Sequence, residues 1–417
     1  HKDADADVGG LACNDDKLLL EMREAIMVWV KSMGRQILAG NLNLVNTSFP
    51  VLMFEPRSYL QKLADPWVYP DYINAAAAAS DPLDRMKLLT TWVVAGMWKG
   101  FDAWKKPFNP ILGETWQASL EGGVSLFMEQ ARPGRGISHH PPVSAYQLVG
   151  PNGSWRFSGW SQPAVAPVVK FYGIKTLAKG RRRFELPDGT VIDFFMPHYA
   201  IKGVVYAARP RAEVLGVLRI VDAANHLEAV VAFGPVKGAR HRVLSRADAV
   251  CGEIYRLPGG AAGAARAAAA APGPRASAAA GGRWRGRRSV TSQDVCSGDG
   301  GHVAAGDLAG ADGSEATYHR NHGARVPGVA VARIEGSWLS HLNIDSRRFW
   351  TLSEAPPRRW APAAAGDALP SDAGARRDLR ALKEGDRLRA QKVKEEMEVE
   401  QRADKKLREA AGIIDHH

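Results

Sequence analysis

The sequence predicts an α+β protein dominated by β structure, in which helices and a lid segment precede a large, near-complete antiparallel β-barrel and a long helix ends the chain. Three observations predict this class. Apolar residues recur with helical periodicity over 16–33 and 59–98. They alternate with period two through much of 104–256 and again after 329. The final stretch, 375–412, is rich in strong helix formers and lacks proline.

The first 34 residues are predicted to form an extension that contains an amphipathic helix. Its apolar side chains fall near one helical face: Leu18, Leu19, Met22, Ile26 and Val30. Residues 41–58 follow, where Pro50 and Pro56 prevent a long helix. We interpret this segment either as an irregular flap or as an edge strand with a turn.

Helices return between Tyr59 and Trp98, where Asp81 and Pro82 give the signal of an N-cap followed by a first turn. Beyond them, the runs "GTVIDFFMP", "AIKGVVYAA" and "EVLGVLRIV" are strand-like and separated by turn residues. Such an antiparallel region stacks into a sandwich or closes into a barrel, and a large barrel can enclose a ligand.

Residues 259–328 interrupt this pattern. Alanine occupies 13 of the 20 positions from 261 to 280, and Trp284 and Tyr318 are the only aromatic residues of the whole segment. We therefore expect a disordered insertion. The chain accordingly divides into the extension (1–34), the lid, helices and main barrel (35–258), the insertion (259–328), and the final strands with the C-terminal helix (329–417).

The formal net charge of +11 favours anionic partners, namely nucleic acid, phosphorylated small molecules or an anionic membrane face. A nucleic-acid role is not favoured, because Arg283, Arg285, Arg287 and Arg288 lie in the insertion without a recognisable reading module. No apolar stretch approaches the ~20 residues of a spanning helix, so membrane contact is expected to be peripheral. Three cysteines that are far apart and lack CxxC spacing, Cys13, Cys251 and Cys296, favour a reducing, cytoplasmic location.

Several motifs, taken in order, resemble the lipid-binding domain of the oxysterol-binding-protein-related family. They are "KKPFNPILGETW" at 105–116, "EQ" at 129–130 followed by "SHHPPVSA" at 138–145, "EGSWLS" at 335–340, and the charged C-terminal stretch. The resemblance covers most of 35–258 and 329–411. It implies a barrel around a lipid tunnel, an N-terminal lid, and a basic entrance for phosphatidylinositol 4-phosphate. Members of the family exchange that lipid for a sterol or, in some branches, for phosphatidylserine.

The resemblance assigns headgroup binding to seven residues of this chain: Lys106, Asn109, His139, His140, Lys394, Glu398 and Arg402. The last three follow one another at steps of four, which leaves them on one face of a helix. There Glu398 can pair with both cations. The double proline after His140 restricts the backbone and presents both imidazoles as donors to a phosphate.

The lid of the family falls on the flap, where apolar residues are expected to cover the tunnel: Leu42, Leu44, Val45, Phe49, Val51 and Leu52. One departure concerns the histidine motif. The family has a single residue between Glu-Gln and Ser-His-His, whereas here "ARPGRGI" occupies 131–137, which is either a loop at a strand end or an error in the gene model.

We therefore expect a lipid exchanger for a sterol and phosphatidylinositol 4-phosphate, with phosphatidylserine in place of the sterol as the alternative. We expect neither an enzyme nor a cofactor. A metal-dependent hydrolase that uses the histidines is the rival from another class. The sequence does not favour it, since HExxH, a nucleophile elbow and a carboxylate-rich metal cluster are missing.

Overall fold

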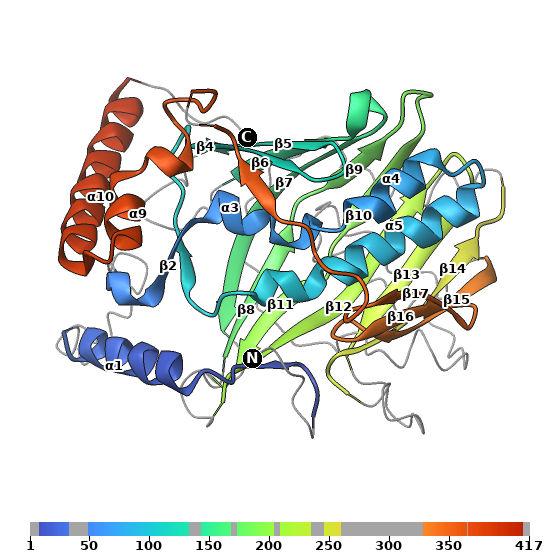
Figure 1. Cartoon of the computed structure of the whole chain (residues 1–417), viewed down its shortest axis with the longest axis horizontal. Coiled ribbons are helices and arrows are strands. Elements are labelled where there is room, and N and C mark those ends of the chain that lie inside the picture. The colour runs from blue at the N-terminus through green and yellow to red at the C-terminus, as the bar shows by residue number, and fades with distance from the viewer. Residues whose placement is uncertain are drawn as a thin grey trace, which may run out of the picture.

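The computed structural model describes residues 8–32, 49–132, 143–167, 173–203, 209–234, 246–259, 328–364 and 366–411. Figure 1 shows a broad curved sheet with helices lying across it and a pair of helices at one end. Several predicted functional residues lie outside the described ranges, namely Leu42, Leu44, Val45, His139 and His140.

The sheet has 16 strands, and its main path runs β17-β16-β15-β14-β13-β12-β10-β9-β7-β6-β5-β4-β18. Its ladders between named strands are all antiparallel. The strands of the first half are β1 (Leu11–Ala12), β4 (Thr115–Leu120), β5 (Val124–Arg132), β6 (Val143–Val149), β7 (Arg156–Pro167), β8 (Gly173–Lys179), β9 (Arg182–Glu185) and β10 (Val191–Phe195). Those of the second half are β11 (His198–Lys202), β12 (Arg211–Asp222), β13 (Leu227–Phe233), β14 (Ala249–Arg256), β15 (Val329–Ser337), β16 (His341–Ile344), β17 (Arg347–Thr351) and β18 (Trp360–Pro362).

The two ends of the main path are β17 and β18, which are consecutive in the chain. Strong twist over so many strands curls a sheet, and here the chain passes directly from one edge to the other. Two hydrogen bonds hold that passage to the helical layer, from Arg358 N to Val68 O (2.9 Å) and from Trp360 Nε1 to Ala64 O (3.0 Å). The predicted architecture, a large antiparallel barrel-like sheet, is confirmed.

The concave side of the sheet packs against α3 (Tyr59–Leu63), α4 (Pro70–Ala78), α5 (Pro82–Gly96) and the short 3-10 helices η2 (Asp65–Trp67) and η3 (Met97–Phe101). Asp81 caps α5 by accepting from Leu83 N, with Pro82 in the first turn, as predicted. The rings of Trp67, Trp92 and Phe157 lie 4.8–5.1 Å apart and join helix and sheet in one continuous core.

The strands β14 and β15 flank the predicted insertion and pair directly with each other. Arg256 faces Val329 at the point where the chain leaves and re-enters the sheet. Residues 260–327 lie outside the described ranges. The sheet therefore continues across the site of the predicted insertion as if β14 and β15 formed a hairpin.

The C-terminal segment is not the single long helix that the sequence predicted. It forms α9 (Arg377–Lys383) and α10 (Arg387–Ala410), which pack side by side in Figure 1. Gly385 has φ +84°, and bonds from Gly385 N to Leu382 O and from Asp386 N to Ala381 O close a Schellman turn. Asp386 then caps α10 by accepting from Arg389 N (2.9 Å). Glycine ends the first helix because it tolerates positive φ without strain.

The N-terminal amphipathic helix is confirmed as α1 (Asp16–Ser32). Leu19 and Ala25 are buried on its inner face. It contacts η1 (Val51–Met53), and Glu21 pairs with Lys105 (3.4 Å). Within the described chain, α1 therefore lies beside the segment that carries Lys105 and Lys106.

Candidate headgroup site

A three-residue strand carries the first predicted ligand. Lys106 begins β3 (Lys106–Phe108), which pairs in parallel with β2 (Phe54–Ser58). Pro107 and Pro110 bracket the motif and keep it extended, while the Phe108 side chain is buried. Phe108 packs 4.7 Å from Phe54. This packing leaves the polar residues of the motif to face outward.

The polar end of Lys106 is held in place by its surroundings. Its Nζ donates to Asn109 Oδ1 (2.5 Å) and lies 4.9 Å from the centroid of the Phe54 ring. A cation over an aromatic face is attracted by the ring quadrupole. Two predicted ligands of the first motif, Lys106 and Asn109, are therefore in direct contact.

The C-terminal helix brings a second cation to the same place. Lys394 on α10 is buried, donates to Glu398 Oε1 (2.6 Å), and has its Nζ 5.4 Å from the same Phe54 centroid. The structure thus brings Lys106, Asn109, Lys394 and Glu398 into one cluster, which we call the headgroup cluster. Its parts come from distant segments of the chain.

The positive charges of this cluster act on each other. The Lys106 side chain is exposed to solvent, but its ammonium lies against Asn109 and over the Phe54 ring. Loss of hydration at the ammonium, followed by the repulsion of the Lys394 charge, lowers the pKa of Lys106 from 10.5 to about 8, while Glu398 acts in the opposite direction. The headgroup cluster therefore carries an excess of positive charge, and a bound anion would offset the repulsion between Lys106 and Lys394.

Arg402 lies two turns beyond Lys394 on α10 and is exposed. Glu398 pairs with Lys394, but within the described ranges Arg402 has no ion-pair partner. The prediction that Glu398 pairs with both cations is confirmed for Lys394 only. The spacing of four nevertheless keeps Lys394, Glu398 and Arg402 on one side of the helix.

His139 and His140 belong to the connection between β5 and β6 and lie outside the described residues. The described end of β5 meets the first motif directly. Gln130 N donates to Glu114 O (2.8 Å), and Gly113 N donates to Gln130 O (3.0 Å). The headgroup role of the two histidines stays a prediction.

Of the predicted lid, Phe49, Val51 and Leu52 are described. Val51 is buried in a small cluster with Phe54, Phe108, Leu379 and Ala390, against which Phe49 also packs. The Val51 backbone N–H donates to Gln391 Oε1 on α10 (2.7 Å). Protein contacts alone account for the burial of Val51, so its role as a cover over lipid stays a prediction.

Sequence reasoning missed three residues of this region: Phe54, Glu114 and Arg376. Phe54 sits in an apolar run and looked like ordinary packing. Arg376 is buried and pairs with Glu114 (2.8 Å) and Asp378 (2.7 Å). The one available signal was the glutamate that ends "FNPILGE", since a buried acidic residue requires a partner.

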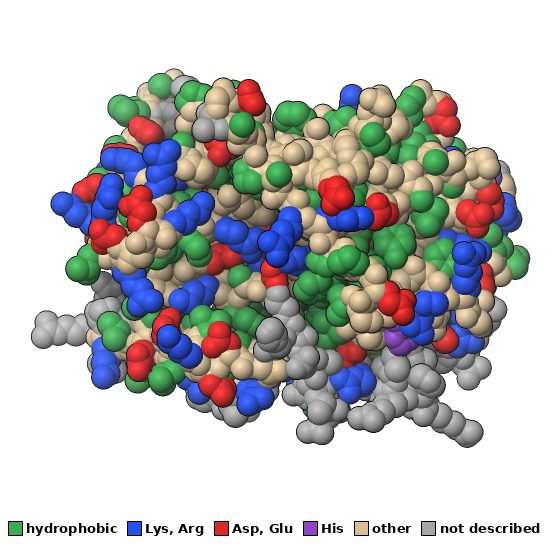
Figure 2. All heavy atoms as spheres, in the orientation of Figure 1, with side chains coloured by type: hydrophobic (Ala, Val, Ile, Leu, Met, Phe, Trp, Pro, Cys, Tyr) green, Lys and Arg blue, Asp and Glu red, His purple; other side chains and the backbone are tan. Residues whose placement is uncertain are grey.

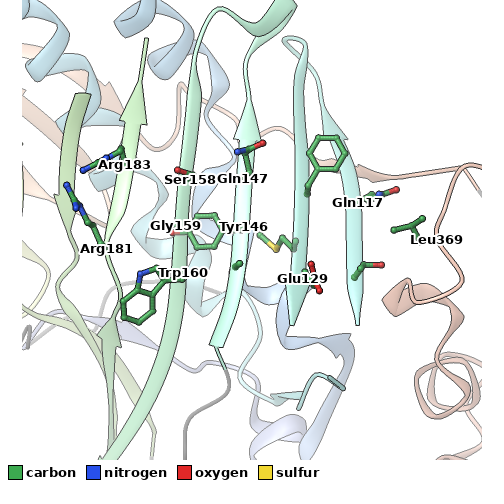
Figure 3. Close-up of a pocket in the computed structure, with 14 residues that line it drawn as sticks. Gln117, Glu129, Tyr146, Gln147, Ser158, Gly159, Trp160, Arg181, Arg183 and Leu369 are labelled. Carbon is green, nitrogen blue, oxygen red and sulfur yellow. The ribbon is translucent and has the colours of Figure 1, made fainter. Parts of the chain in front are cut away.

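Lys and Arg side chains gather over the α9–α10 side of the molecule, interspersed with Asp and Glu (Figure 2). An open groove of about 670 Å³ lies elsewhere, on the strands β4 to β7 and β9 (Figure 3). Phe127 and Trp160 line it and are 47% and 40% exposed, and Arg181 and Arg183 share Asp193 there. None of the predicted headgroup ligands lines this groove.

The fold is shared with solved lipid-binding domains. The Osh1 ORD domain in complex with ergosterol matches with a TM-score of 0.57 at 19% identity, over 89% of this chain and 78% of that one. The Osh3 ORD from Saccharomyces cerevisiae in complex with PI(4)P matches with a TM-score of 0.58 at 17% identity, over 92% and 84%. At these identities the likeness shows the fold alone, so the class of fold is that of the Osh ORD domains.

The sequence comparisons specify the family. The model for oxysterol-binding protein matches residues 34–264, which is more than half of the chain. Oxysterol-binding protein 9 of Dictyostelium discoideum is 29% identical over 407 residues, covering 95% of this chain and 79% of that protein. Oxysterol-binding protein-related protein 5 of Mus musculus is 31% identical over 214 residues, 50% of this chain but only 23% of that protein. The chain belongs to the oxysterol-binding protein family.

Two further findings concern membrane-spanning helices and metal sites. Within the described ranges, no helix has the length and apolar character needed to cross a bilayer. In the same part of the chain, no cluster of three or more His, Cys, Asp or Glu side chains has a geometry that could hold a metal ion.

Proposed function

We propose that this protein is a peripheral, cytoplasmic lipid exchanger that carries a sterol in one direction and phosphatidylinositol 4-phosphate in the other, without covalent chemistry. The observation that carries the proposal is the convergence of Lys106 and Lys394 on one aromatic ring at the edge of a lipid-binding fold. The related Osh1 and Osh3 domains were solved with ergosterol, cholesterol and PI(4)P, which supports both ligands.

The headgroup would bind through charge and hydrogen bonds. Lys106, Lys394 and Arg402 supply cations for the 4-phosphate, and the amide of Asn109 supplies a further hydrogen-bonding group. We assign His139 and His140 to the same phosphate, because their segment joins β5 beside the first motif. Glu398 orients Lys394 through its 2.6 Å contact rather than binding the phosphate.

The tail would be sheltered inside the sheet, below the headgroup cluster, with 42–52 as its lid. Exposing ~400 Å² of apolar lipid surface to water costs on the order of 10 kcal/mol, so an enclosing protein removes most of the barrier to transfer. The lid would cover the lipid with its apolar side chains, namely Leu42, Leu44, Val45, Phe49, Val51 and Leu52. A single shelter cannot hold both lipids, so a gradient of one drives transport of the other.

The test is extraction of lipid from liposomes by the wild type and by the double variant His139→Ala/His140→Ala. We expect the variant to lose extraction of phosphatidylinositol 4-phosphate and to keep binding of a fluorescent sterol nearly unchanged. His341→Ala, a histidine on β16, serves as the matched control. Unchanged phosphoinositide extraction by the double variant would refute the assignment of this pair. Parallel liposomes with phosphatidylserine identify the second lipid.

A further inference from the structure

A buried ionic network lies next to the headgroup cluster and is not part of it. Arg376, at the start of α9, has its guanidinium within hydrogen-bond distance of three different groups. It contacts Asp378 through two bonds (2.7 and 3.1 Å), Glu114 Oε2 (2.8 Å) and the backbone carbonyl of Asn109 (2.8 Å). All three ionic side chains are buried, with at most 9% of their surface exposed.

The contact to the Asn109 carbonyl is the informative one. Asn109 is three residues from Lys106, and its side-chain oxygen accepts a hydrogen bond from the Lys106 ammonium. The guanidinium of Arg376 also lies 5.6 Å from the Phe108 ring, between these two residues. Arg376 therefore fixes the backbone of the motif from below, while the motif presents Lys106 to solvent.

Glu114 extends the network to other segments. It accepts from the Ser58 hydroxyl, which belongs to the end of β2, and from the backbone N–H of Ile111 (3.0 Å). Its own carbonyl accepts from Gln130 N at the end of β5 (2.8 Å). The pair of Glu114 and Arg376 thus ties together β2, the 106–114 loop, β5 and α9.

The network of Glu114 and Arg376 matters because it links the two elements that carry the cations. Lys106 sits on the loop and Lys394 on α10, and the two must keep one separation to hold a single phosphate. Because α9 packs on α10, a bond from α9 to the loop fixes that separation. Cations held in place before binding lose less freedom when the ligand arrives. A planar, bidentate guanidinium does this better than a lysine ammonium.

We propose that Arg376 is a positioning residue of the headgroup site, which locks the Lys106–Asn109 loop onto α9 and so sets the spacing between Lys106 and Lys394 for a phosphate monoester. This inference rests on the proposed headgroup function. It assigns Arg376 no contact with the ligand. It also distinguishes Arg376 from its neighbour Arg377, which is exposed and pairs weakly with Glu400 (3.5 Å).

The experiment measures binding of a short-chain phosphatidylinositol 4-phosphate by titration calorimetry to the full chain. The variants are Arg376→Lys, Lys106→Ala and the two combined, with Arg377→Lys as the matched control. We expect Arg376→Lys to weaken binding about tenfold or more, and to have little further effect once Lys106 is alanine, because a positioning residue acts through the group it positions. Sterol binding should change less than about twofold, and Arg377→Lys should match the wild type.

Two outcomes would overturn the inference: wild-type affinity in Arg376→Lys, or a loss that stays the same in the Lys106→Ala background, which indicates a general structural role. Failure of the proposed function looks different, since then the wild type binds no headgroup or Lys106→Ala binds as well as the wild type. Should Arg376→Lys fail to fold, Glu114→Gln takes its place, because it removes the ion pair at nearly constant volume. Its effect on binding is then measured with and without Lys106→Ala, and the same two outcomes would overturn the inference.

Discussion

The ammonium groups of Lys106 and Lys394 lie over the same phenyl ring, 4.9 and 5.4 Å from the Phe54 centroid. Two like charges at such positions repel each other, and the aromatic ring and Glu398 offset part of that repulsion. The two ammonium groups are thus positioned for a dianion, and their repulsion destabilises the protein when no ligand is bound. Arrangements of this kind are expected at binding sites rather than in structural ion pairs.

Headgroup affinity should fall as pH rises from 7 to 9. The pKa of Lys106 is about 8, so its charge is largely present at pH 7 and largely lost at pH 9. The phosphate monoester, with a second pKa near 6, stays dianionic throughout. We expect an affinity loss of about tenfold across this range, measured by calorimetry with short-chain phosphatidylinositol 4-phosphate.

Lys106→Arg is the control for that titration, because a guanidinium stays charged at pH 9. Its affinity should vary less with pH than that of the wild type, and any slope that remains belongs to other groups. A wild-type affinity that is flat between pH 7 and 9 would contradict the role given to Lys106.

Substitution of Phe54 by leucine should weaken headgroup binding while the protein stays folded. The change keeps an apolar side chain in the cluster with Val51 and Phe108 but removes the ring beneath both ammonium groups. Each cation–π contact contributes about 0.5–2 kcal/mol, and both contacts already exist in the free protein. We therefore expect the affinity to fall by about the energy of one contact, which is about twofold to thirtyfold. Phe101→Leu, a buried aromatic that contacts Tyr199 and Trp338, controls for the loss of packing. Equal affinities in the two variants would show that the ring has no special role.

The part of the site that the sequence predicted best is the part set by local geometry. The contact between Lys394 and Glu398 follows from their spacing on a helix. Their meeting with Lys106 depends on how α9 and α10 pack over β2 and β3, which periodicity does not reveal; only the resemblance to a family predicted it. Phe54 went unnoticed because an aromatic residue in an apolar run is usually core.

The fold shows the same division. Strand-like runs between turn residues predicted β10, β11 and β12 because sheet patterning is local, whereas the order of the strands is a tertiary property. The break between α9 and α10 was missed although its signal was present. Gly385 followed by Asp386 is the sequence of a helix stop and a new N-cap, but strong helix formers on both sides concealed it.

Gly385→Ala should destabilise the protein by about 1–2 kcal/mol, because an L-residue is strained at φ +84°. Crowding is not the cause, since a Cβ built there meets no atom within 4 Å. Gly366→Ala is the matched control, at a glycine that also has open space but no positive φ. Midpoints of chemical denaturation measure both. Equal stabilities would mean that the turn relaxes without strain.

Removal of residues 258–327 should leave the fold and the lipid binding intact. Arg256 and Val329 already face each other, so Leu257, an inserted Asn-Gly and Gly328 form a four-residue hairpin loop between β14 and β15. We expect sterol and phosphatidylinositol 4-phosphate binding within about twofold of the full chain and a melting temperature within about 2 °C. Binding to RNA and DNA, measured on both proteins, tests the arginines of that segment. Nucleic-acid affinity that disappears with the deletion would give the segment a function of its own. A folded deletion variant that no longer binds lipid would contradict the view that the barrel and its headgroup cluster suffice.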